Sequence, residues 1–188
     1  MSNSRRLTFF TGENYEVPLD TGCTGCFIHQ NINNLPAIFR PVFDRNGIRI
    51  LQDNEVAVPG LYIISPIEHY DSINNFPIEL YNTFSHARFH LMKVMKQFLG
   101  DDLLMVQTHS EGRLSGNAHY HEWFIPYWKS IADKYKIVPK IYLPKGRPGF
   151  DNYIADIYGY MQLFKYNKKT KQRIQKYNQL LTKYFNEI

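Results

Sequence analysis

The chain has 188 residues, of which 44% are hydrophobic, so it is long enough to bury a core and short enough to form one domain with an appendage. No stretch approaches the roughly 18 apolar residues of a membrane span, and the N-terminal segment lacks the apolar run of a secretory signal. We therefore expect a cytoplasmic protein that does not cross a membrane.

The formal net charge of +5 is concentrated near the C-terminus. From residue 157 onward the chain carries seven Lys or Arg and a single Glu. A basic stretch of this kind is usually the solvated face of a helix, and the alternative is a contact with nucleic acid or another polyanion.

The two cysteines, Cys23 and Cys26, stand in the sequence "GCTGCF". In a cytoplasmic protein this spacing favours a metal site or a redox pair over a disulfide scaffold. A reduced pair without a metal is the alternative.

The first half of the chain predicts three antiparallel strands. Residues 37–53 contain Asn46-Gly47 between two β-rich runs, which is a hairpin signal. Residues 60–66 predict a short apolar strand between Pro59-Gly60 and Pro66.

Residues 76–100 predict a long helix, because apolar residues recur there at helical spacing. Pro77 suits the first turn and Gly100 suits the C-terminal cap. His86 and His90 lie four residues apart, a spacing that can bind a metal, but no Glu lies between them. We interpret them as solvated surface histidines.

The second half predicts a strand over 103–110, a Gly-containing loop and a second strand over 119–128. Helical spacing returns from Tyr153 to Phe185. The fold class is therefore α+β, with an antiparallel sheet, a helix on one face and a C-terminal helical extension.

His119 and His121 alternate with other residues on a predicted strand, so they share one face with Trp123. Neutral imidazole is a good nucleophile toward phosphorus, and a second imidazole can hold a phosphate or fix the tautomer of the first. The pair suits covalent phosphoryl or nucleotidyl transfer. A pair of structural histidines is the alternative.

Together these elements resemble the histidine triad (HIT) superfamily, over residues 22–128. "VPGLYIISPIEHYDSI" is similar to the strand that leads to the family's Pro-x-x-His, and "LLMVQTHSEGRLSGNAHYHEWFIP" is similar to its last strand, loop and triad. The pattern is nearest to zinc-containing HIT hydrolases and to galactose-1-phosphate uridylyltransferase-like branches. The resemblance implies a HIT-like domain over 22–130, after an N-terminal segment (1–21) and before a basic, mostly helical extension (131–188) packed on the same domain.

The resemblance implies catalytic roles for His121 and His119. His121 matches the middle histidine, which in the family attacks the α-phosphate of a nucleotide and forms a nucleotidyl-histidine intermediate, and His119 matches the first. Asp53 matches an acidic residue that binds the ribose hydroxyls. Its alternative is a turn Asp in "QDNE".

Further nucleotide-binding positions follow from the same resemblance. Gln107 or Thr108 falls near a polar family position beside the phosphates. The loop residues from Ser115 to Asn117 face the phosphates in the family, and Trp123 takes the third triad position.

The zinc-containing branches imply a structural zinc held by Cys23, Cys26, His69 and His119. Two thiolates and two imidazoles form a closed tetrahedral zinc site. The alternative is a catalytic metal held by histidines alone, namely His69, His119 and His121.

The chain departs from the family at two positions. Trp123 stands where hydrolases have His and transferases often have Gln, and an indole offers a donor but no acceptor. Glu122 stands where the family usually has an apolar residue.

The resemblance implies a nucleotide-conjugate hydrolase or nucleotidyltransferase, with a nucleotide or nucleotide conjugate as substrate. The alternative is a catalytically inactive HIT-like module that binds a nucleotide or an RNA end, with the basic tail as a nucleic-acid contact. Many small family members are homodimers, and the residues after Trp128 either permit or block that interface.

Overall fold

The computed structural model describes residues 4–18, 22–98, 100–111, 119–135 and 159–188. Two sheets and several helices make up the described part. The strands are β1 (Ser4–Thr8), β2 (Asn14–Pro18), β3 (Phe43–Arg45), β4 (Ile48–Gln52), β5 (Tyr62–Pro66), β6 (Leu103–Glu111) and β7 (His121–Trp128). The α-helices are α1 (Thr24–Gln30), α2 (Ile78–Phe98), α3 (Lys129–Tyr135) and α5 (Lys168–Asn186). Short 3-10 helices cover Ile32–Asn34, Ala37–Phe39 and Ile73–Asn75.

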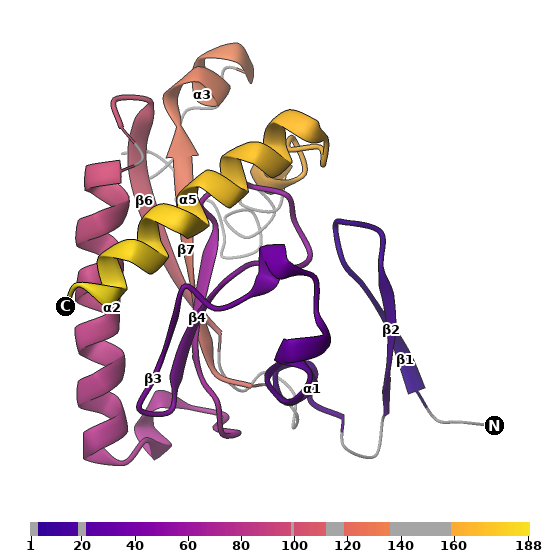
Figure 1. Ribbon diagram of the computed structural model, residues 1–188, viewed down its shortest axis with the longest axis vertical. Coiled ribbons are helices and arrows are strands. Elements are labelled where there is room, and N and C mark those ends of the chain that lie inside the picture. Colours follow the sequence, from indigo (N-terminus) through magenta and orange to yellow (C-terminus); the bar gives the residue numbers. More distant parts are fainter. Residues whose placement is uncertain (1–3, 19–21, 99, 112–118, 136–158) are drawn as a thin grey trace, which may run out of the picture.

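The central sheet has five antiparallel strands in the order β3-β4-β5-β7-β6 (Figure 1). Strand β7 lies between β5 and β6, so the strand predicted over 119–128 is an inner strand, but it begins at His121 and His119 precedes it. The predicted α+β class, with an antiparallel sheet and a long helix, is confirmed.

The predicted turn at Asn46-Gly47 joins β3 to β4. Both residues have positive φ, 48° and 81°, which is the conformation that a two-residue hairpin turn requires and that Asn and Gly adopt most readily. The first part of the predicted strand region, Ala37–Phe39, is instead a 3-10 helix. Pro36 precedes it, and the Arg40 N–H donates to the Ala37 carbonyl, which closes a turn in place of a strand.

Helix α2 confirms the predicted helix. Its first turn follows Pro77, whose carbonyl accepts from the Tyr81 N–H, and Gly100 has a φ of 75° just beyond the C-terminal end. The apolar residues at helical spacing face the core and are buried: Phe84, Ala87, Leu91, Val94 and Met95.

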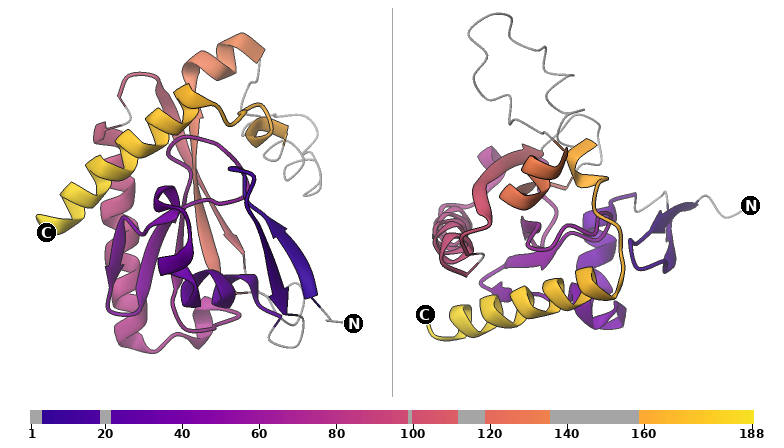
Figure 2. Two further views of the ribbon diagram at one scale, coloured as in Figure 1. Left: turned by 45° about the vertical axis from the view of Figure 1, so that its right-hand side comes forward. Right: turned by 90° about the horizontal axis from the view of Figure 1, so that it is seen from above.

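Helices α2 and α5 build one core cluster with the same face of the sheet. The C-terminal end of α5 lies beside α2 (Figures 1 and 2). The sheet contributes Ile48, Ile50, Tyr62, Ile64, Tyr120, Phe124 and Trp128 to this cluster, and α5 contributes Tyr177, Leu181 and Phe185. Burial of these side chains is the main source of stability for this half of the molecule.

The opposite face of β7 packs on residues close to the C-terminal helix. Trp123, Ile125 and Tyr127 form a second cluster with Tyr160 and Met161. The Tyr160 hydroxyl donates to the Pro126 carbonyl (2.7 Å) and accepts from the Trp128 N–H (3.0 Å). A side chain therefore satisfies backbone groups of β7 beyond the end of its pairing with β5.

The N-terminal residues form a hairpin that the sequence did not predict. Strands β1 and β2 pair with each other and lie on the side of the molecule away from α2 (Figure 2). Leu7, Phe9 and Val17 pack on a third cluster that includes Phe39 and Leu51.

The predicted helical region from Tyr153 to Phe185 is helical mainly in α5, which begins at Lys168 after an Asn167 N-cap. Residues 153–158 lie outside the described part. The division at residues 21 and 130 stays a prediction, although α5 shares its core with the sheet. Among the described helices, none has the length and apolarity that a membrane crossing requires.

Candidate metal centre and histidine pair

Helix α1 presents both cysteines from its first turn. Cys23 is the N-cap residue, and its Sγ accepts from the Cys26 backbone N–H at 3.3 Å. An N–H that points at a sulfur favours the thiolate, which is the form that binds metals. Cys23 is buried, and Cys26 is partly buried beside a hollow of about 630 Å³ between β2 and α1.

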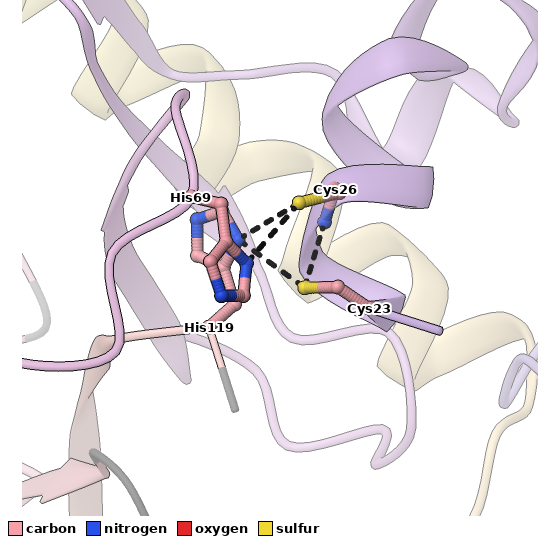
Figure 3. A group of neighbouring side chains, drawn as sticks. All are labelled: Cys23, Cys26, His69 and His119. Atoms are coloured by element: carbon pink, nitrogen blue, oxygen red, sulfur yellow. Dashed lines mark hydrogen bonds between the residues drawn. The ribbon is translucent and has the colours of Figure 1, made fainter. Parts of the chain in front are cut away.

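Two histidines from distant segments face these sulfurs (Figure 3). His69 follows β5, and His119 precedes β7. Nδ1 of His119 lies 3.4 Å from Cys23 Sγ and 3.5 Å from Cys26 Sγ, and Nδ1 of His69 lies 3.4 Å from Cys26 Sγ. The four ligand atoms all lie within 4.8 Å of one another.

This arrangement fits zinc. Zinc binds sulfur at about 2.3 Å and nitrogen at about 2.05 Å, so a sulfur and a nitrogen on a tetrahedral ion are about 3.5 Å apart. The three measured S···N distances, 3.4 to 3.5 Å, match that edge. The donor set of two cysteines and two histidines is one that structural zinc prefers.

A backbone carbonyl fixes the tautomer of His119. Its Nε2 lies 2.8 Å from the Pro66 carbonyl oxygen, so Nε2–H donates and Nδ1 keeps a lone pair toward the cysteines. Burial lowers the pKa of His119 to about 4, although the bond to Pro66 opposes this shift. The imidazole is therefore neutral at pH 7, as a metal ligand must be.

Without a cation, the Cys26 thiol is costly to ionise. Burial and the neighbouring Cys23 sulfur raise the pKa of Cys26 to about 12. A divalent ion at the site would remove this penalty, because a coordinated thiol loses its proton outright.

Gly25 lets the α1 backbone approach the His119 ring. A Cβ at Gly25 would lie 2.5 Å from Cγ of His119, well inside van der Waals contact. The second middle position of the C-x-x-C motif, Gly25, therefore accepts no side chain unless His119 moves.

The structure gives His121 a defined tautomer as well. Its Nδ1 lies 2.8 Å from the His119 carbonyl oxygen. Because a carbonyl only accepts, Nδ1 carries the proton and Nε2 carries the lone pair. His121 is partly buried at the start of β7, and its ring centroid lies 6.0 Å from that of Trp123.

Asp53 follows β4 and has the turn role that was its alternative reading. Its Oδ1 accepts from the Glu55 and Val56 backbone N–H groups, both at 2.8 Å. Burial raises the pKa of Asp53 to about 7. The two backbone N–H donors and the charge of His121 act in the opposite direction and lower it. Asp53 and His121 are therefore electrostatic neighbours. The ribose role stays a prediction.

Glu122 has a structural partner that explains why an acid stands on this strand. Its carboxylate is buried and accepts from Arg88 Nε (2.8 Å) on α2 and from the Tyr120 hydroxyl (3.1 Å). Trp123 points to the opposite face and packs in the cluster with Leu61 and Met161, at 8% exposure.

Three of the predicted nucleotide-binding positions are described only partly or not at all. The backbone of Gln107 pairs with Ile125 across the β6–β7 ladder, and the position of its side chain lies outside the described structure. Ser115 and Asn117 also lie outside it. Their roles stay predictions.

The sequence analysis missed His29, which lies beside the metal centre. Its ring centroid is 5.2 Å from that of His119, and its Nε2 is 3.0 Å from Ser65 Oγ. Burial, with His119 and Arg49 nearby, lowers the pKa of His29 to about 3. A signal was present, because His29 continues the three-residue spacing of the cysteines along α1. Nothing in the sequence marked Gly25 or Arg88.

No family model matches the sequence, and no curated protein matches it. Solved structures do match. A hypothetical protein from Leishmania major is 15% identical, with a TM-score of 0.50 over 76% of this chain and 95% of that one. A HIT family member from Bacillus subtilis is 18% identical, with a TM-score of 0.48 over 73% of this chain and 95% of that one.

A zinc-bound histidine triad family protein from Mycobacterium smegmatis is 12% identical, with a TM-score of 0.45 over 76% of this chain and 94% of that one. At these identities the likeness concerns the fold. Two of these three solved structures are described as histidine triad (HIT) family proteins.

Proposed function

We propose that this chain is a histidine triad protein that hydrolyses or transfers the nucleotidyl group of a nucleotide conjugate, with His121 as nucleophile. The observation that carries the proposal is the 2.8 Å bond from His121 Nδ1 to the His119 carbonyl. It leaves Nε2 as the nitrogen for attack on phosphorus, which is what covalent nucleotidyl transfer requires.

The reaction has two displacements. In the first, His121 Nε2 forms a bond to the α-phosphorus while the bond from phosphorus to the leaving group breaks. In the second, water or an acceptor hydroxyl attacks the same phosphorus, loses its proton, and the phosphorus–nitrogen bond breaks. The His119 carbonyl stabilises the positive charge that His121 carries in the intermediate.

Asp53 is proposed as the group that binds the ribose. A carboxylate can accept two hydroxyl hydrogen bonds. Oδ1 of Asp53 already accepts from the Glu55 and Val56 N–H groups of the turn, so the ribose would bind at Oδ2. Its electrostatic contact with His121 supports a carboxyl near the nucleophile. Phosphate contacts from Gln107, Ser115 and Asn117 are part of the same proposal.

A structural zinc is proposed at Cys23, Cys26, His69 and His119. The support is the match of the sulfur–nitrogen distances to a tetrahedral edge and the tautomer set by Pro66. Zinc there would hold His119, and through its carbonyl it would hold His121. The ion supplies rigidity, and the chemistry belongs to the protein side chains.

Trp123 restricts the leaving group. Its indole cannot pass a proton to a departing amine, and its side chain is committed to a hydrophobic cluster. We expect conjugates whose leaving group departs as a stable anion, such as dinucleoside polyphosphates and nucleotide sugars, to react before phosphoramidates.

The test is the intact mass of the protein after incubation with a panel of dinucleoside polyphosphates, nucleotide sugars and nucleoside phosphoramidates. We expect a nucleotidyl adduct on the native chain and none on His121→Ala, whereas His121→Asn still binds nucleotide. His86→Ala, a histidine change on α2, serves as the control and keeps the adduct. Full turnover by His121→Ala would overturn the proposal.

A second candidate function is an inactive module that binds a nucleotide or an RNA end. It is favoured by five exposed lysines on α5, which are Lys168, Lys169, Lys171, Lys176 and Lys183. If it holds, no adduct forms on any substrate, and RNA affinity falls steeply with salt and weakens when Lys168, Lys169 and Lys171 become Gln. If RNA affinity changes neither with salt nor with the lysine substitutions, this candidate function is ruled out. A homodimer and a cytoplasmic location stay predictions.

A further inference from the structure

His86 and His90 form a pair on the outer side of α2, on a different element from the centre described above. Their Nε2 atoms lie 3.2 Å apart, and their ring centroids lie 4.3 Å apart. His86 is exposed and His90 is partly buried. The two imidazoles lie one helical turn apart, and each directs its Nε2 atom toward a common point.

A third residue orients this pair. Nδ1 of His90 lies 2.7 Å from the Tyr184 hydroxyl, which belongs to α5. When Nδ1–H donates to that hydroxyl, Nε2 of His90 carries the lone pair and accepts from Nε2–H of His86. The pair is then held in place by one hydrogen bond from each ring.

The spacing of the two nitrogens fits a shared metal ion. An ion about 2.05 Å from both Nε2 atoms would subtend an N–metal–N angle of about 100°, between the octahedral and tetrahedral values. Binding would displace only the Nε2 proton of His86, which moves to Nδ1 of the same ring or to water.

We propose that His86 and His90 form a second metal site, for a divalent late transition metal such as Zn²⁺ or Ni²⁺, with Tyr184 as its positioning residue. Imidazole nitrogen suits these ions, and the exposed side of His86 leaves room for water ligands. The Tyr184 bond makes His90 the fixed ligand and His86 the adaptable one. Because His90 on α2 is hydrogen-bonded to Tyr184 on α5, an ion bound to His90 would also link the two helices.

The experiment starts from protein with one zinc per chain and titrates Zn²⁺ by calorimetry, with elemental analysis after gel filtration. We expect a second equivalent, and at about tenfold excess over its Kd a rise in Tm of about 4 °C. His86→Ala and His90→Ala each abolish the second equivalent and the rise in Tm, and each keeps the first zinc. Ser85→Ala, on the same helix, is the matched control and keeps both ions.

Tyr184→Phe distinguishes a metal site from two histidines that are joined only by a hydrogen bond. Loss of a partner that orients a ligand weakens metal affinity by about tenfold or more, so Tyr184→Phe should bind the second zinc that much more weakly. Long-range ¹H–¹⁵N spectra of the histidines should show both Nε2 resonances, of residues 86 and 90, moving with added Zn²⁺. A second equivalent that persists in the His86→Ala, His90→Ala double variant, or no second equivalent in the native chain, would overturn the proposal.

Discussion

At the residue scale, the metal centre depends on the absence of a side chain at Gly25. The α1 backbone lies against the His119 ring, and a Cβ there would lie 2.5 to 2.9 Å from three atoms of that side chain. His119 in turn makes two hydrogen bonds that matter: its Nε2–H donates to the Pro66 carbonyl, and its own carbonyl accepts from His121 Nδ1–H. A small change at residue 25 should therefore affect both the candidate metal ligands and His121, the proposed nucleophile.

Gly25→Ala should weaken zinc binding by about tenfold or more and lower the free energy of unfolding by about 1 to 3 kcal/mol, because His119 must shift. Competition with a chromophoric chelator measures the first effect, and urea unfolding measures the second. Gly159→Ala is the control, since a Cβ at Gly159 meets nothing within 4 Å. Equal zinc affinity in both variants would contradict the close approach.

Asp53 makes stability depend on pH. Its pKa is about 7 in the folded chain, whereas an Asp in the unfolded chain has the ordinary value of 3.8, so between these values the folded state binds the extra proton. Stability from this group is therefore fully present below pH 3.8, decreases as the pH rises from there toward 7, and is lost above it. Asp53→Asn keeps an Oδ1 acceptor for Glu55 and Val56 and removes this dependence.

As the pH rises from 5 to 8, the native chain should lose about 2 kcal/mol of its free energy of unfolding relative to Asp53→Asn. Urea unfolding across that range measures it. Asp101→Asn, at an exposed position, should track the native chain at every pH. Parallel curves for the native chain and Asp53→Asn would show that the carboxyl is ionised throughout.

At the element scale, an ion pair with one buried partner links α2 to β7. Arg88 Nε and Glu122 Oε2 are 2.8 Å apart, with side-chain exposures of 48% and 7%. The same helix packs its apolar stripe on the sheet, so the ion pair adds a specific polar contact to a hydrophobic interface. Glu122 is the more dependent partner, because water reaches Arg88 but hardly reaches the carboxylate.

Arg88→Ala should lower the free energy of unfolding by about 1 to 3 kcal/mol, because among the described residues it leaves the buried Glu122 carboxylate with the Tyr120 hydroxyl alone. Chemical denaturation measures the loss. Lys183→Ala breaks an exposed pair with Glu187 (3.9 Å) and should cost less than about 0.5 kcal/mol. The assignment fails if the two variants are equally stable.

At the scale of the whole molecule, the candidate metal centre joins α1 to two segments that the β5–β7 pairing already holds together. The two segments are the residues after β5 and the residues before β7, and the ligands Cys23 and His119 are 96 residues apart. A bound ion therefore links the N-terminal third of the chain to its inner strand. Binding energy at such a site is also folding energy.

Removal of the metal should lower Tm by about 10 °C or more, since a structural zinc contributes several kcal/mol to folding. The hollow beside Cys26 and His69 gives a chelator access. The measurement is a thermal melt under reducing conditions before and after chelation, with zinc content by elemental analysis, and added zinc should restore Tm. An unchanged Tm in metal-free protein would argue against a structural role.

Patterns local in the chain were enough to predict much of the fold. Asn46-Gly47 predicted its hairpin because few residues adopt two successive positive φ angles. The apolar repeat from Leu80 to Phe98 predicted α2, since only a helix places those side chains on one face. The β1–β2 hairpin was missed, because its strands alternate weakly and its burial comes from later segments.

The sequence by itself determined the long helix, most strands of the central sheet, and the alternation that puts His121 and Trp123 on one face of β7. Through the family resemblance it also predicted the set of Cys23, Cys26, His69 and His119, whose side chains the structure brings together. Only the tertiary structure decided that Arg88 meets Glu122 and that Tyr184 meets His90. The physical reason is that backbone periodicity depends on near neighbours in the chain. Contacts between segments depend on how the buried faces pack, and no local pattern encodes that.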